Sequence, residues 1–505
     1  MLKKIILKGE QKKVLFLPPT NPIQIKGVAG SGKTTVAVYR AKHLLETHNT
    51  LFKEAKIAIF TFNETLAAYI RAVSPYINGG YQKDSNEVKP KTPDGLNVTI
   101  VSFHSWAFRF AGISLNSTAM PWEQIDILDG IRKSMTSTSS NVLNKSSEFF
   151  QEEISWIKGK LFTSKSEYIE AKRSGRGTSD RVTASDKEVI WSVLLKYNQE
   201  LKNRGKVDFD DYALLSLKKI ESEPNWKPPF THIIIDEAQD LNKAQILVIS
   251  KLVSQETKSI SIITDAAQRI FKSGFTWSEV GLNVIGGRTI SLKKNYRNTI
   301  QIAEVAKSLL DNEVDKDDFT EIEFSNRPGK KPKIACCESF DEQLEVLKEE
   351  LNKLIETKSI FSTVILHRTL AGVTNIKKLL DSNGYETEII KTNDVIDYKN
   401  SCIKICTMPS IKGLEFQNVF IIDLNDNIIP YPDGFIDEQD YFHISTERRL
   451  LYTCMTRAES ELFLLTSDRT NASRYLKEIN PDLLEDITPN NWFDGTYFGE
   501  CSFPF

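Results

Sequence analysis

The chain holds 505 residues, which exceeds the roughly 100–200 residues of an ordinary domain and predicts at least two domains with their own cores. With 40% hydrophobic and 26% charged residues, and no apolar stretch near the roughly 20 residues that cross a bilayer, the composition argues against a membrane protein. The formal net charge of −2 excludes nucleic-acid binding through a global excess of positive charge, so any such site must be a local groove.

The N-terminus and the cysteines indicate a cytoplasmic protein. The N-terminal sequence MLKKIILKGEQKK lacks the apolar run of about 7 to 15 residues and the cleavage site of a secretory signal. The 6 cysteines form no CxxC pair with a matching second pair or nearby histidines, so we expect reduced thiols and no structural zinc. They all lie in the second half of the chain, at Cys336, Cys337, Cys402, Cys406, Cys454 and Cys501.

The first part of the chain alternates apolar strands with helices. Residues 23–27 are expected to form a strand that runs into a glycine-rich turn, and the following TTVAVYRAKHLLETH keeps its apolar residues at helical spacing. Apolar runs beginning at Ile57, Thr231 and Ile260 each end in polar residues, as buried parallel strands do when their carboxyl ends carry the chemistry. This pattern predicts an α/β fold with a doubly wound parallel sheet.

Two changes of pattern divide the remainder. Between Trp106 and about Gly205 the sequence becomes helical and charged, which predicts a helical insertion in the first lobe. A second set of strands begins near Thr289 and includes TVILHRT, IKICTM, NVFIIDL and ELFLLTS, which predicts a second α/β lobe. We therefore expect four parts: the first lobe in two pieces, 1–105 and 206–288, the helical insertion at 106–205, and the second lobe with a C-terminal tail at 289–505.

The strongest single motif is GVAGSGKT, residues 27–34, which fits the G-x-x-x-x-G-K-S/T pattern at a strand-to-helix junction. In such a loop the glycines let backbone N–H groups point at phosphate oxygens, Lys33 reaches the outer phosphates, and the Thr34 hydroxyl ligates Mg²⁺. The sequence therefore predicts a site for ATP and Mg²⁺. Its expected nucleotide contacts are Gly27, Ala29, Gly30, Ser31, Gly32, Lys33, Thr34 and Thr35.

The segment IIIDEAQD places Asp236 and Glu237 at the end of an apolar strand. One carboxylate can hold Mg²⁺ and the next can polarise a water for attack on the γ-phosphate. Two adjacent acids alone are weak evidence, but their place downstream of a phosphate loop predicts an enzyme that hydrolyses ATP. Thr34 and Asp236 are the expected Mg²⁺ ligands, and Lys33, Asp236 and Glu237 the expected catalytic residues.

Further segments extend this prediction beyond an ATPase. LKGEQKKV, IFTFN, VSFHSWA, TDAAQRIF, SLKKNYRNT, TMPSIKGLEF and LLYTCMTRAES follow one another along the chain. In this order they resemble the motifs of the UvrD/Rep family of superfamily 1 helicases, and the resemblance runs from about Leu7 to Leu465. It implies two tandem RecA-like P-loop lobes that work as an ATP-driven motor, moving 3′ to 5′ along single-stranded DNA.

The resemblance also assigns roles at the nucleotide. Gln11 is expected to contact adenine, Tyr296 to stack on it, and Glu415 to meet the ribose. Arginine suits the γ-phosphate end because its guanidinium stays charged and can fork onto phosphate oxygens, and such a finger is worth roughly 10³ to 10⁵ in rate. The catalytic residues implied there are the γ-phosphate sensor Gln268 and the arginines Arg297 and Arg457.

A further set of residues is expected, by the same resemblance, to contact DNA: Thr61, Phe62, Ser102, His104, Arg368, Thr407 and Ser410. Without the resemblance, an aromatic such as Phe62 in an apolar strand would be read as core. The loop AKRSGRGTSDR could add phosphate contacts from the helical insertion, or it could simply be a solvated basic loop. Its basic residues are Lys172, Arg173, Arg176 and Arg181.

The chain departs from the family's pattern at three places. Thr35 stands where many relatives have an arginine, so one face of adenine is expected to be held differently. Pro409 stands where relatives have a histidine, which changes the local backbone and removes a donor. Ser273 replaces an aromatic residue, and Phe275 and Trp277 are the nearest substitutes for stacking on a base, with core packing as the alternative.

The second lobe is shorter than in relatives. The family inserts a large duplex-engaging subdomain there, whereas this chain has only a short segment around KTNDVIDYKN, so we expect that subdomain to be missing. The expected partners are single-stranded or tailed duplex DNA, and the aromatic tail NNWFDGTYFGECSFPF could dock a separate nuclease or cover the second lobe. Neither end is expected to hold a fused nuclease.

Two rival functions remain open at this point. One is a DNA-stimulated ATPase that regulates or loads a partner nuclease without unwinding by itself. The other is a catalytically weak DNA-binding module, against which the set of Lys33, Glu237, Arg297 and Arg457 argues. RNA as the substrate is also open, because stacking and phosphate contacts tolerate either sugar.

Overall fold

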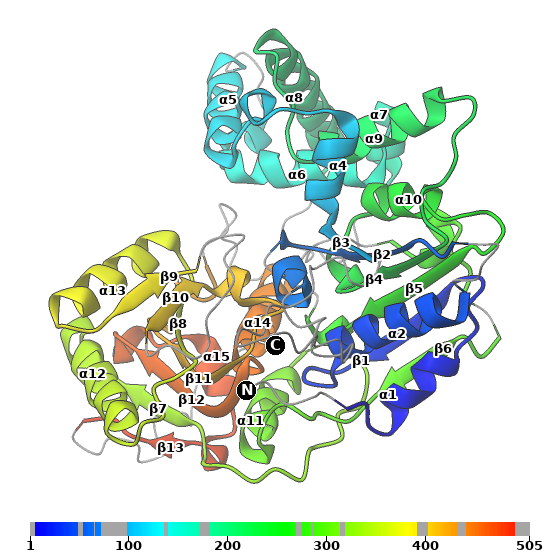
Figure 1. Cartoon of the computed structure of the whole chain (residues 1–505). Helices are drawn as coiled ribbons and strands as arrows, with labels where there is room; N and C mark the ends of the chain where they lie inside the picture. The colour runs from blue at the N-terminus through cyan, green and yellow to red at the C-terminus, as the bar shows by residue number, and fades with distance from the viewer. Residues whose placement is uncertain are drawn as a thin grey trace.

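The computed structural model describes residues 6–48, 54–64, 66–71, 98–135, 140–171, 182–268, 275–284, 286–313, 319–390, 402–431 and 441–489. Two sheets of parallel strands lie side by side, and a group of helices stands above the first sheet (Figure 1). The fold class expected from sequence, two RecA-like α/β lobes with a helical insertion in the first, is therefore confirmed.

The first lobe is built on a six-stranded sheet with the order β3-β2-β4-β5-β1-β6, and every neighbouring pair is parallel. β2, β4 and β5 are buried at every residue, as strands are when helices cover both faces of a parallel sheet. The strands are β1 Ile23–Gly27, β2 Ile57–Thr61, β3 Val98–Ser102, β4 His232–Ile235, β5 Ser259–Thr264 and β6 Thr289–Leu292.

The boundary between the lobes lies later than expected. β6 begins at Thr289, where the second lobe was predicted to start, but it pairs with β1 and so belongs to the first sheet. The prediction was wrong because the local sequence shows that a strand forms and not which strand it pairs with. The helices that flank this sheet are α1 Glu10–Lys13, α2 Lys33–His48 and α10 Lys243–Lys251.

The helical insertion has a core of its own, in which Phe149, Phe150, Tyr168 and Tyr197 are fully buried. Below it, α4 and α9 pack against each other and join it to the first sheet. None of the helices in the described ranges has the length and apolar character needed to cross a membrane. The helices of this region are α4 Phe103–Ala111, α5 Pro121–Ser134, α6 Ser147–Lys160, α7 Lys165–Glu170, α8 Ala184–Asn203 and α9 Asp211–Ser222.

The second lobe is built on a seven-stranded parallel sheet with the order β13-β7-β12-β11-β8-β10-β9. Separate apolar clusters line its two faces, so helices cover it on both sides. Its strands are β7 Lys333–Cys336, β8 Thr363–His367, β9 Thr387–Ile389, β10 Ile403–Thr407, β11 Phe416–Ile421, β12 Ala458–Thr466 and β13 Glu485–Asp486. Its helices are α11 Ile300–Leu310, α12 Phe340–Glu356, α13 Leu370–Ser382, α14 Tyr441–Met455 and α15 Arg474–Glu478.

Candidate nucleotide site between the lobes

The phosphate loop joins β1 to α2 and has a shape that requires glycine. Gly30 and Gly32 have φ angles of 70° and 78°, in the left-handed region. A Cβ atom on Gly27 would lie 2.7 Å from the side chains of Lys33 and Ser31. The loop therefore brings its backbone close to any ligand at the N-terminus of α2, where the helix dipole favours an anion.

Lys33 and Thr34 open α2 and reach the acidic residues of neighbouring strands. The Lys33 ammonium donates to the carbonyls of Gly27 at 3.2 Å and Val28 at 3.1 Å, and forms an ion pair with Asp265 at 2.9 Å. The Thr34 hydroxyl donates to a carboxylate oxygen of Asp236 at 2.8 Å. The two residues expected to ligate Mg²⁺ thus lie side by side.

The acidic pair follows β4, with Glu237 in the left-handed region at φ 53°. Burial, together with the charge of Glu237, raises the pKa of Asp236 to about 7. Burial would raise the pKa of Glu237 too, but Lys412, Lys33 and Arg457 surround it and lower that pKa to about 2. The second carboxylate is therefore held ionised by cations from both lobes.

The expected γ-phosphate residues meet across the two lobes. Gln268 ends the first-lobe turn η5 (Ala266–Gln268), and its side-chain oxygen accepts from Arg457 of the second lobe at 2.5 Å. Arg297, beyond β6, donates to the Thr456 carbonyl at 3.2 Å and pairs with Glu415. Glu415, expected at the ribose, is thus engaged by an arginine in this structure.

Two buried polar atoms in this site lack, within the described part of the chain, a hydrogen-bond partner that a nucleotide could supply. The Ser31 hydroxyl and the Nε of Arg297 are buried with no hydrogen-bond partner among the described residues. Leaving such groups unpaired costs about 1–3 kcal/mol each, and a phosphate group supplies acceptors for both. The residues present therefore fit a nucleoside triphosphate.

The base end of the site lies where α1 touches the phosphate loop. The Gln11 amide donates to the Ser31 carbonyl at 2.7 Å and accepts from the Lys8 backbone at 2.8 Å, which leaves one hydrogen and one lone pair for a base. The Tyr296 backbone donates to the Gly30 carbonyl at 2.8 Å. Gln11 and Tyr296 thus both contact the phosphate loop, and their predicted contacts with adenine remain a prediction.

Two other expected nucleotide contacts lie in the loop and its helix. Ala29 is buried in the apolar cluster of the second lobe, so the loop itself touches both lobes. Thr35 is half-buried on α2, one helical step beyond Thr34.

Lys412 is a functional candidate that the sequence did not single out. It follows the turn η7 (Met408–Ile411) of the second lobe, is 2% exposed, and reaches into the first lobe. Its ammonium lies 2.5 Å from Asp240 and 3.8 Å from Glu237, and donates to the Gln268 carbonyl at 2.8 Å. In the sequence it lies in the segment TMPSIKGLEF, which resembles a helicase motif without assigning this lysine a role, and only the fold supplies its partners.

The expected DNA contacts differ in their availability. Thr407 and Ser410 lie at the carboxyl end of β10, with hydroxyls 2.8 Å apart and partly open to solvent. Arg368, in contrast, makes a two-pronged pair with Glu447 at 2.9 and 3.0 Å and lies 4.9 Å from the centre of the Tyr431 ring. Arg368 is therefore not open to DNA in this structure, because its charge is already paired.

Two predicted DNA contacts of the first lobe are buried. Ser102 is 2% exposed, caps the N-terminus of α4 by accepting from the Ser105 backbone at 3.2 Å, and donates to Glu64 at 2.9 Å. Thr61 is 0% exposed and its hydroxyl donates to the Asn63 carbonyl at 2.8 Å. Both hydroxyls are engaged in local hydrogen bonds, so neither is available to DNA in this structure.

The aromatic candidates pack onto the first lobe. Phe62 is half-buried against its core, and Phe275 and Trp277 pack on the same cluster as an edge-to-face pair at 5.5 Å. His104 lies against the rings of Phe209 and Tyr212, and burial lowers its pKa to about 4. An uncharged His104 can donate one hydrogen bond to DNA but cannot neutralise a phosphate.

Some predictions fall outside the described residues. These are the basic residues Lys172, Arg173, Arg176 and Arg181, the departure at Ser273, the short segment at 391–400 and the aromatic tail at 490–505.

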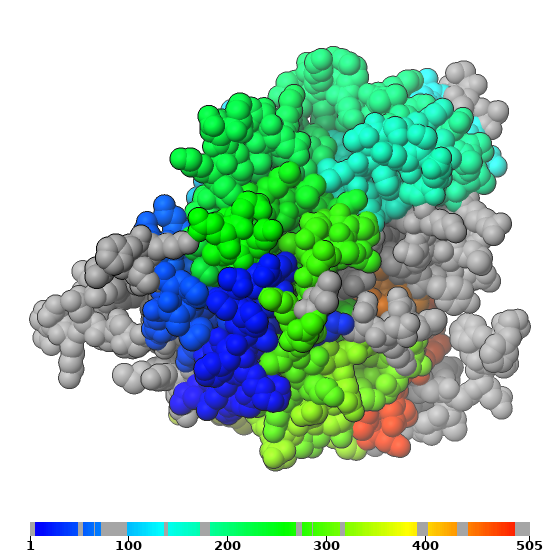
Figure 2. All heavy atoms as spheres, turned by 90° about the vertical axis from the view of Figure 1, so that its right-hand side faces the viewer, coloured from blue at the N-terminus to red at the C-terminus, as the bar shows by residue number. Residues whose placement is uncertain are grey.

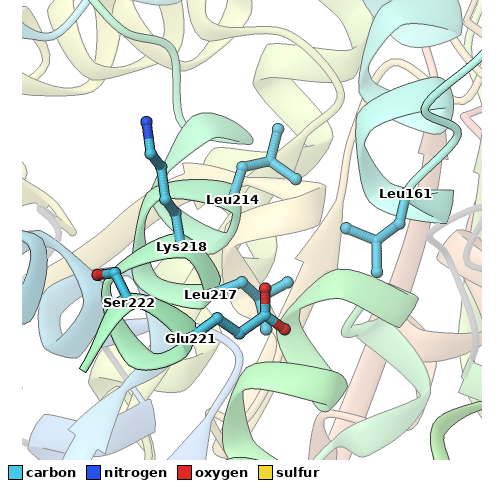
Figure 3. Close-up of a pocket in the computed structure, with 6 residues that line it drawn as sticks. All are labelled: Leu161, Leu214, Leu217, Lys218, Glu221 and Ser222. Carbon is cyan, nitrogen blue, oxygen red and sulfur yellow. The ribbon is translucent and has the colours of Figure 1, made fainter. Parts of the chain in front are cut away.

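A surface pocket of about 470 Å³ lies between the end of α6 and α9 (Figure 3). Its lining contains no residue of the phosphate loop or the acidic pair, so it is separate from the nucleotide site. It is lined by Leu161, Leu214, Leu217, Lys218, Glu221 and Ser222.

The geometry is that of a P-loop nucleotide-binding protein with two tandem RecA-like lobes. The family model for the UvrD/REP helicase N-terminal domain matches residues 7–277, and that for the UvrD-like helicase C-terminal domain matches residues 290–399 and 387–469. The chain belongs to the UvrD/REP helicase family.

Individual relatives agree with this assignment. The chain is 23% identical over 377 residues to an ATP-dependent DNA helicase PcrA of Leuconostoc citreum, which covers 71% of this chain and 46% of the relative. It is 23% identical over 407 residues to a probable DNA helicase II homolog of Mycoplasma capricolum, covering 76% and 52%. The chain spans about half the length of the curated relatives it matches.

One solved structure is the C-terminal domain of a possible DNA helicase from Lactobacillus plantarum. It is 23% identical with a TM-score of 0.29, and the match covers 38% of this chain and 98% of that one.

Proposed function

We propose that this protein is an ATP-driven translocase of single-stranded DNA that moves 3′ to 5′. The observation that carries the proposal is the meeting of both lobes at one nucleotide site. Arg457 of the second lobe contacts Gln268 of the first at 2.5 Å, and Lys412 of the second lobe lies 2.5 Å from Asp240. A nucleotide bound there would touch both lobes, so its hydrolysis can change how they sit together.

The residues supply the parts of phosphoryl transfer. When held by Thr34 and Asp236, Mg²⁺ would neutralise charge on the outer phosphates. Lys33 would exchange its carbonyl partners Gly27 and Val28 for phosphate oxygens. The ionised Glu237 would orient the attacking water.

Charge that develops on the transferred group would be stabilised by Arg297 and Arg457. Both guanidinium groups come from beyond β6, so catalysis depends on contact between the lobes.

The DNA-facing hydroxyls adjoin this site in sequence. Thr407 directly precedes the turn η7, Ser410 lies within it, and Lys412 directly follows it. We propose that single-stranded DNA runs across the carboxyl ends of both sheets, so that its contacts with η7 move together with Lys412. Opening and closing of the lobes would then alternate their grip on the DNA and produce steps.

We further propose that residues 106–205 work as one helical subdomain.

A second candidate is a DNA-stimulated ATPase that regulates or loads a separate nuclease. It is favoured by the short connection between β9, which ends at Ile389, and β10, which begins at Ile403, where relatives of the family carry a duplex-engaging subdomain. Such a protein would hydrolyse ATP on DNA without displacing a strand.

One experiment separates these candidates. ATP hydrolysis is measured without nucleic acid and with oligo-dT or oligo-rU, and displacement of streptavidin is followed from either end of a biotinylated single strand. The translocase should be stimulated by oligo-dT and should clear streptavidin faster from the 5′ end. Stimulation without displacement would favour the second candidate, and absence of ATP hydrolysis would contradict both.

A further inference from the structure

Arg40 is a buried cation whose acceptors are all backbone carbonyls. It lies on α2, is 1% exposed, and has no carboxylate partner among the described residues. Its Nη1 donates to the carbonyls of Val14 at 3.2 Å, Leu15 at 2.8 Å and Leu17 at 2.8 Å, and its Nη2 to that of Pro18 at 2.8 Å. Burial lowers its pKa to about 10, so the guanidinium remains charged at neutral pH.

The carbonyls that Arg40 holds close the segment carrying the base contact. α1 (Glu10–Lys13) continues into η1 (Val14–Phe16), and these carbonyls lie in and just beyond η1. Free carbonyls at the end of a helical segment attract a cation. Gln11 sits in α1, so Arg40 fixes the far end of the element that presents Gln11.

The same helix begins at the phosphate-binding lysine. α2 starts at Lys33 and carries Arg40 on its second turn, so one rigid helix joins the phosphate loop to the N-terminal segment. Figure 2 shows this N-terminal stretch, in blue, packed on the outside of the first lobe. A helical segment as short as α1 is not stable alone, so its position depends on such tethers.

The position of Gln11 is defined tightly. Its Nε2 donates to the Ser31 carbonyl at 2.7 Å, and a Cβ atom on Gly32 would lie 2.5 Å from the same nitrogen. A small displacement of the segment would break this contact and move the free hydrogen-bonding groups of Gln11 away from a base. An apolar side chain could fill the same space without the cost of burying a charge. The presence of Arg40 there therefore indicates that its hydrogen bonds have a role.

We propose that Arg40 is a positioning residue for the nucleotide base: it holds Gln11 in place, so that base selectivity depends on it whereas phosphate binding and hydrolysis do not. This inference rests on the proposed ATPase function.

The test compares Arg40→Met with the wild-type protein in steady-state hydrolysis of ATP and GTP in the presence of oligo-dT. Loss of the Gln11 contact should raise KM for ATP about tenfold, the equivalent of one or two hydrogen bonds, with kcat changed less than about twofold. The preference for ATP over GTP should largely disappear. Inhibition by tripolyphosphate, which has no base, should be unchanged. Arg40→Lys should restore part of the selectivity, because its ammonium can donate up to three hydrogen bonds.

Arg132→Met is the matched control. Arg132 on α5 donates through Nε and Nη2 to the Leu143 carbonyl at 3.2 Å, in the short turn η3 (Asn141–Asn144) of the helical insertion. Its Nη1 also donates to the Ser147 hydroxyl at 2.9 Å and lies 3.5 Å from Asp129. It should lose thermal stability as Arg40→Met does while keeping the wild-type KM and base preference.

Gln11→Ala shows whether Arg40 acts through Gln11. In that background Arg40→Met should raise KM no further, since interacting residues are not additive.

The inference is overturned if Arg40→Met keeps the ATP preference, or if it weakens the binding of tripolyphosphate and ATP equally. If Arg40→Met does not fold, Arg40→Lys with unaltered base preference and unaltered KM overturns it. Should the wild-type protein not hydrolyse ATP, the proposed function fails, and equilibrium binding of fluorescent ATP and GTP analogues still decides the role of Arg40.

Discussion

The two acidic residues after β4 look alike in sequence, but their surroundings give them different pKa values. Asp236 contacts the Thr34 hydroxyl, whereas Glu237 lies among cations from both lobes. Their pKa values move in opposite directions, to about 7 and about 2. The contact with the Thr34 hydroxyl suits Asp236 for a cation site, and the ionised state of Glu237 suits it for orienting water.

The first prediction concerns this division. Glu237→Gln keeps the size of the side chain and removes its charge, so ATP turnover should fall at least ~10²-fold while nucleotide binding persists. Steady-state hydrolysis and equilibrium binding of a fluorescent ATP analogue measure the two effects. Lys33→Ala should lose both. Near wild-type turnover in Glu237→Gln would show that another group orients the water.

The second prediction concerns Lys412, which joins the second lobe to Asp240 and Glu237. Lys412→Met should lower DNA-stimulated kcat about tenfold and change KM for ATP less than about threefold, because it removes a contact between lobes rather than a nucleotide contact. Lys412→Arg should recover much of the rate. Hydrolysis titrated with oligo-dT provides the measurement.

Lys404→Met is the control for Lys412. Lys404 is also a buried lysine of the second lobe, 4% exposed and 2.6 Å from Glu388, but it lies on β10 away from the first lobe. Lys412→Met should lose stability, since removing one partner of a buried ion pair is costly, and Lys404→Met should lose less, because its partner Glu388 is half-exposed. An equal loss of kcat in both would mean that Lys412 acts only through stability.

The third prediction follows from His104. Its pKa falls from an ordinary 6.5 to about 4 in the folded protein, so between these values the unfolded chain binds more protons. Folding stability should therefore fall as the pH drops below 6.5, by about 1–2 kcal/mol at pH 5 from this residue. His104→Phe keeps a ring against Phe209 and Tyr212 and should remove that part of the dependence. Urea unfolding of both proteins at pH 5 and 7.5 tests this. If the unfolding free energy of the wild-type protein and of His104→Phe changed equally between the two pH values, the prediction would be contradicted.

At the scale of elements, α4 shows how one motif residue can serve structure. Ser102 ends β3 and caps α4, and Glu64 accepts hydrogen bonds from Ser102 and Ser105, each at 2.9 Å. Burial would raise the pKa of Glu64, but its hydrogen bonds to Arg71 and the two serines lower it. The cap thus links a strand end, a helix and a buried carboxylate.

The fourth prediction is that Ser102→Ala lowers stability by about 0.5–2 kcal/mol, the usual cost of losing an N-cap. Ser410→Ala, at an exposed hydroxyl in η7, should instead weaken oligo-dT binding a few-fold without a change in unfolding. Chemical unfolding and fluorescence anisotropy separate the two effects. If Ser102→Ala weakens DNA binding at full stability, its role as a DNA contact returns.

At the scale of the whole molecule, the proposed translocation requires only the two lobes. The fifth prediction is that the chain moves on single strands but unwinds a tailed duplex of a few tens of base pairs poorly without a partner. Each base-pair step costs about 1.4 kcal/mol to separate, and only a short stretch of sequence connects β9, which ends at Ile389, to β10, which begins at Ile403.

Single-turnover assays with a protein trap test this, by comparing streptavidin displacement with release of an annealed strand. Efficient unwinding of the long duplex by the monomer would mean that the helical insertion or the segment at 391–400 takes the role of the duplex-engaging subdomain that we expect to be missing.

The sequence by itself determined the fold class and the nucleotide end of the site. The strands β1, β2, β4, β5, β8, β10, β11 and β12 were predicted from their apolar runs, because periodicity is a local property, whereas β3, β7 and β9 were not predicted. The phosphate loop and the pair Asp236 and Glu237 were equally readable, since their chemistry requires fixed residue types at fixed spacing. The sequence could not predict to which sheet β6 belongs, because strand pairing joins segments that lie far apart in the chain.

Only the tertiary structure decided which polar residues are free and which are engaged. Arg368 and Ser102 matched DNA-contact motifs. In the structure, however, Arg368 pairs with the carboxylate of Glu447, and Ser102 caps the N-terminus of α4. The sequence assigned no role to Lys412, which lies in the segment TMPSIKGLEF, or to Arg40, yet each is buried at a junction of the nucleotide site. The physical reason is common to all four: the worth of a charged or polar side chain depends on burial and on partners, and both are set by residues far away in the sequence.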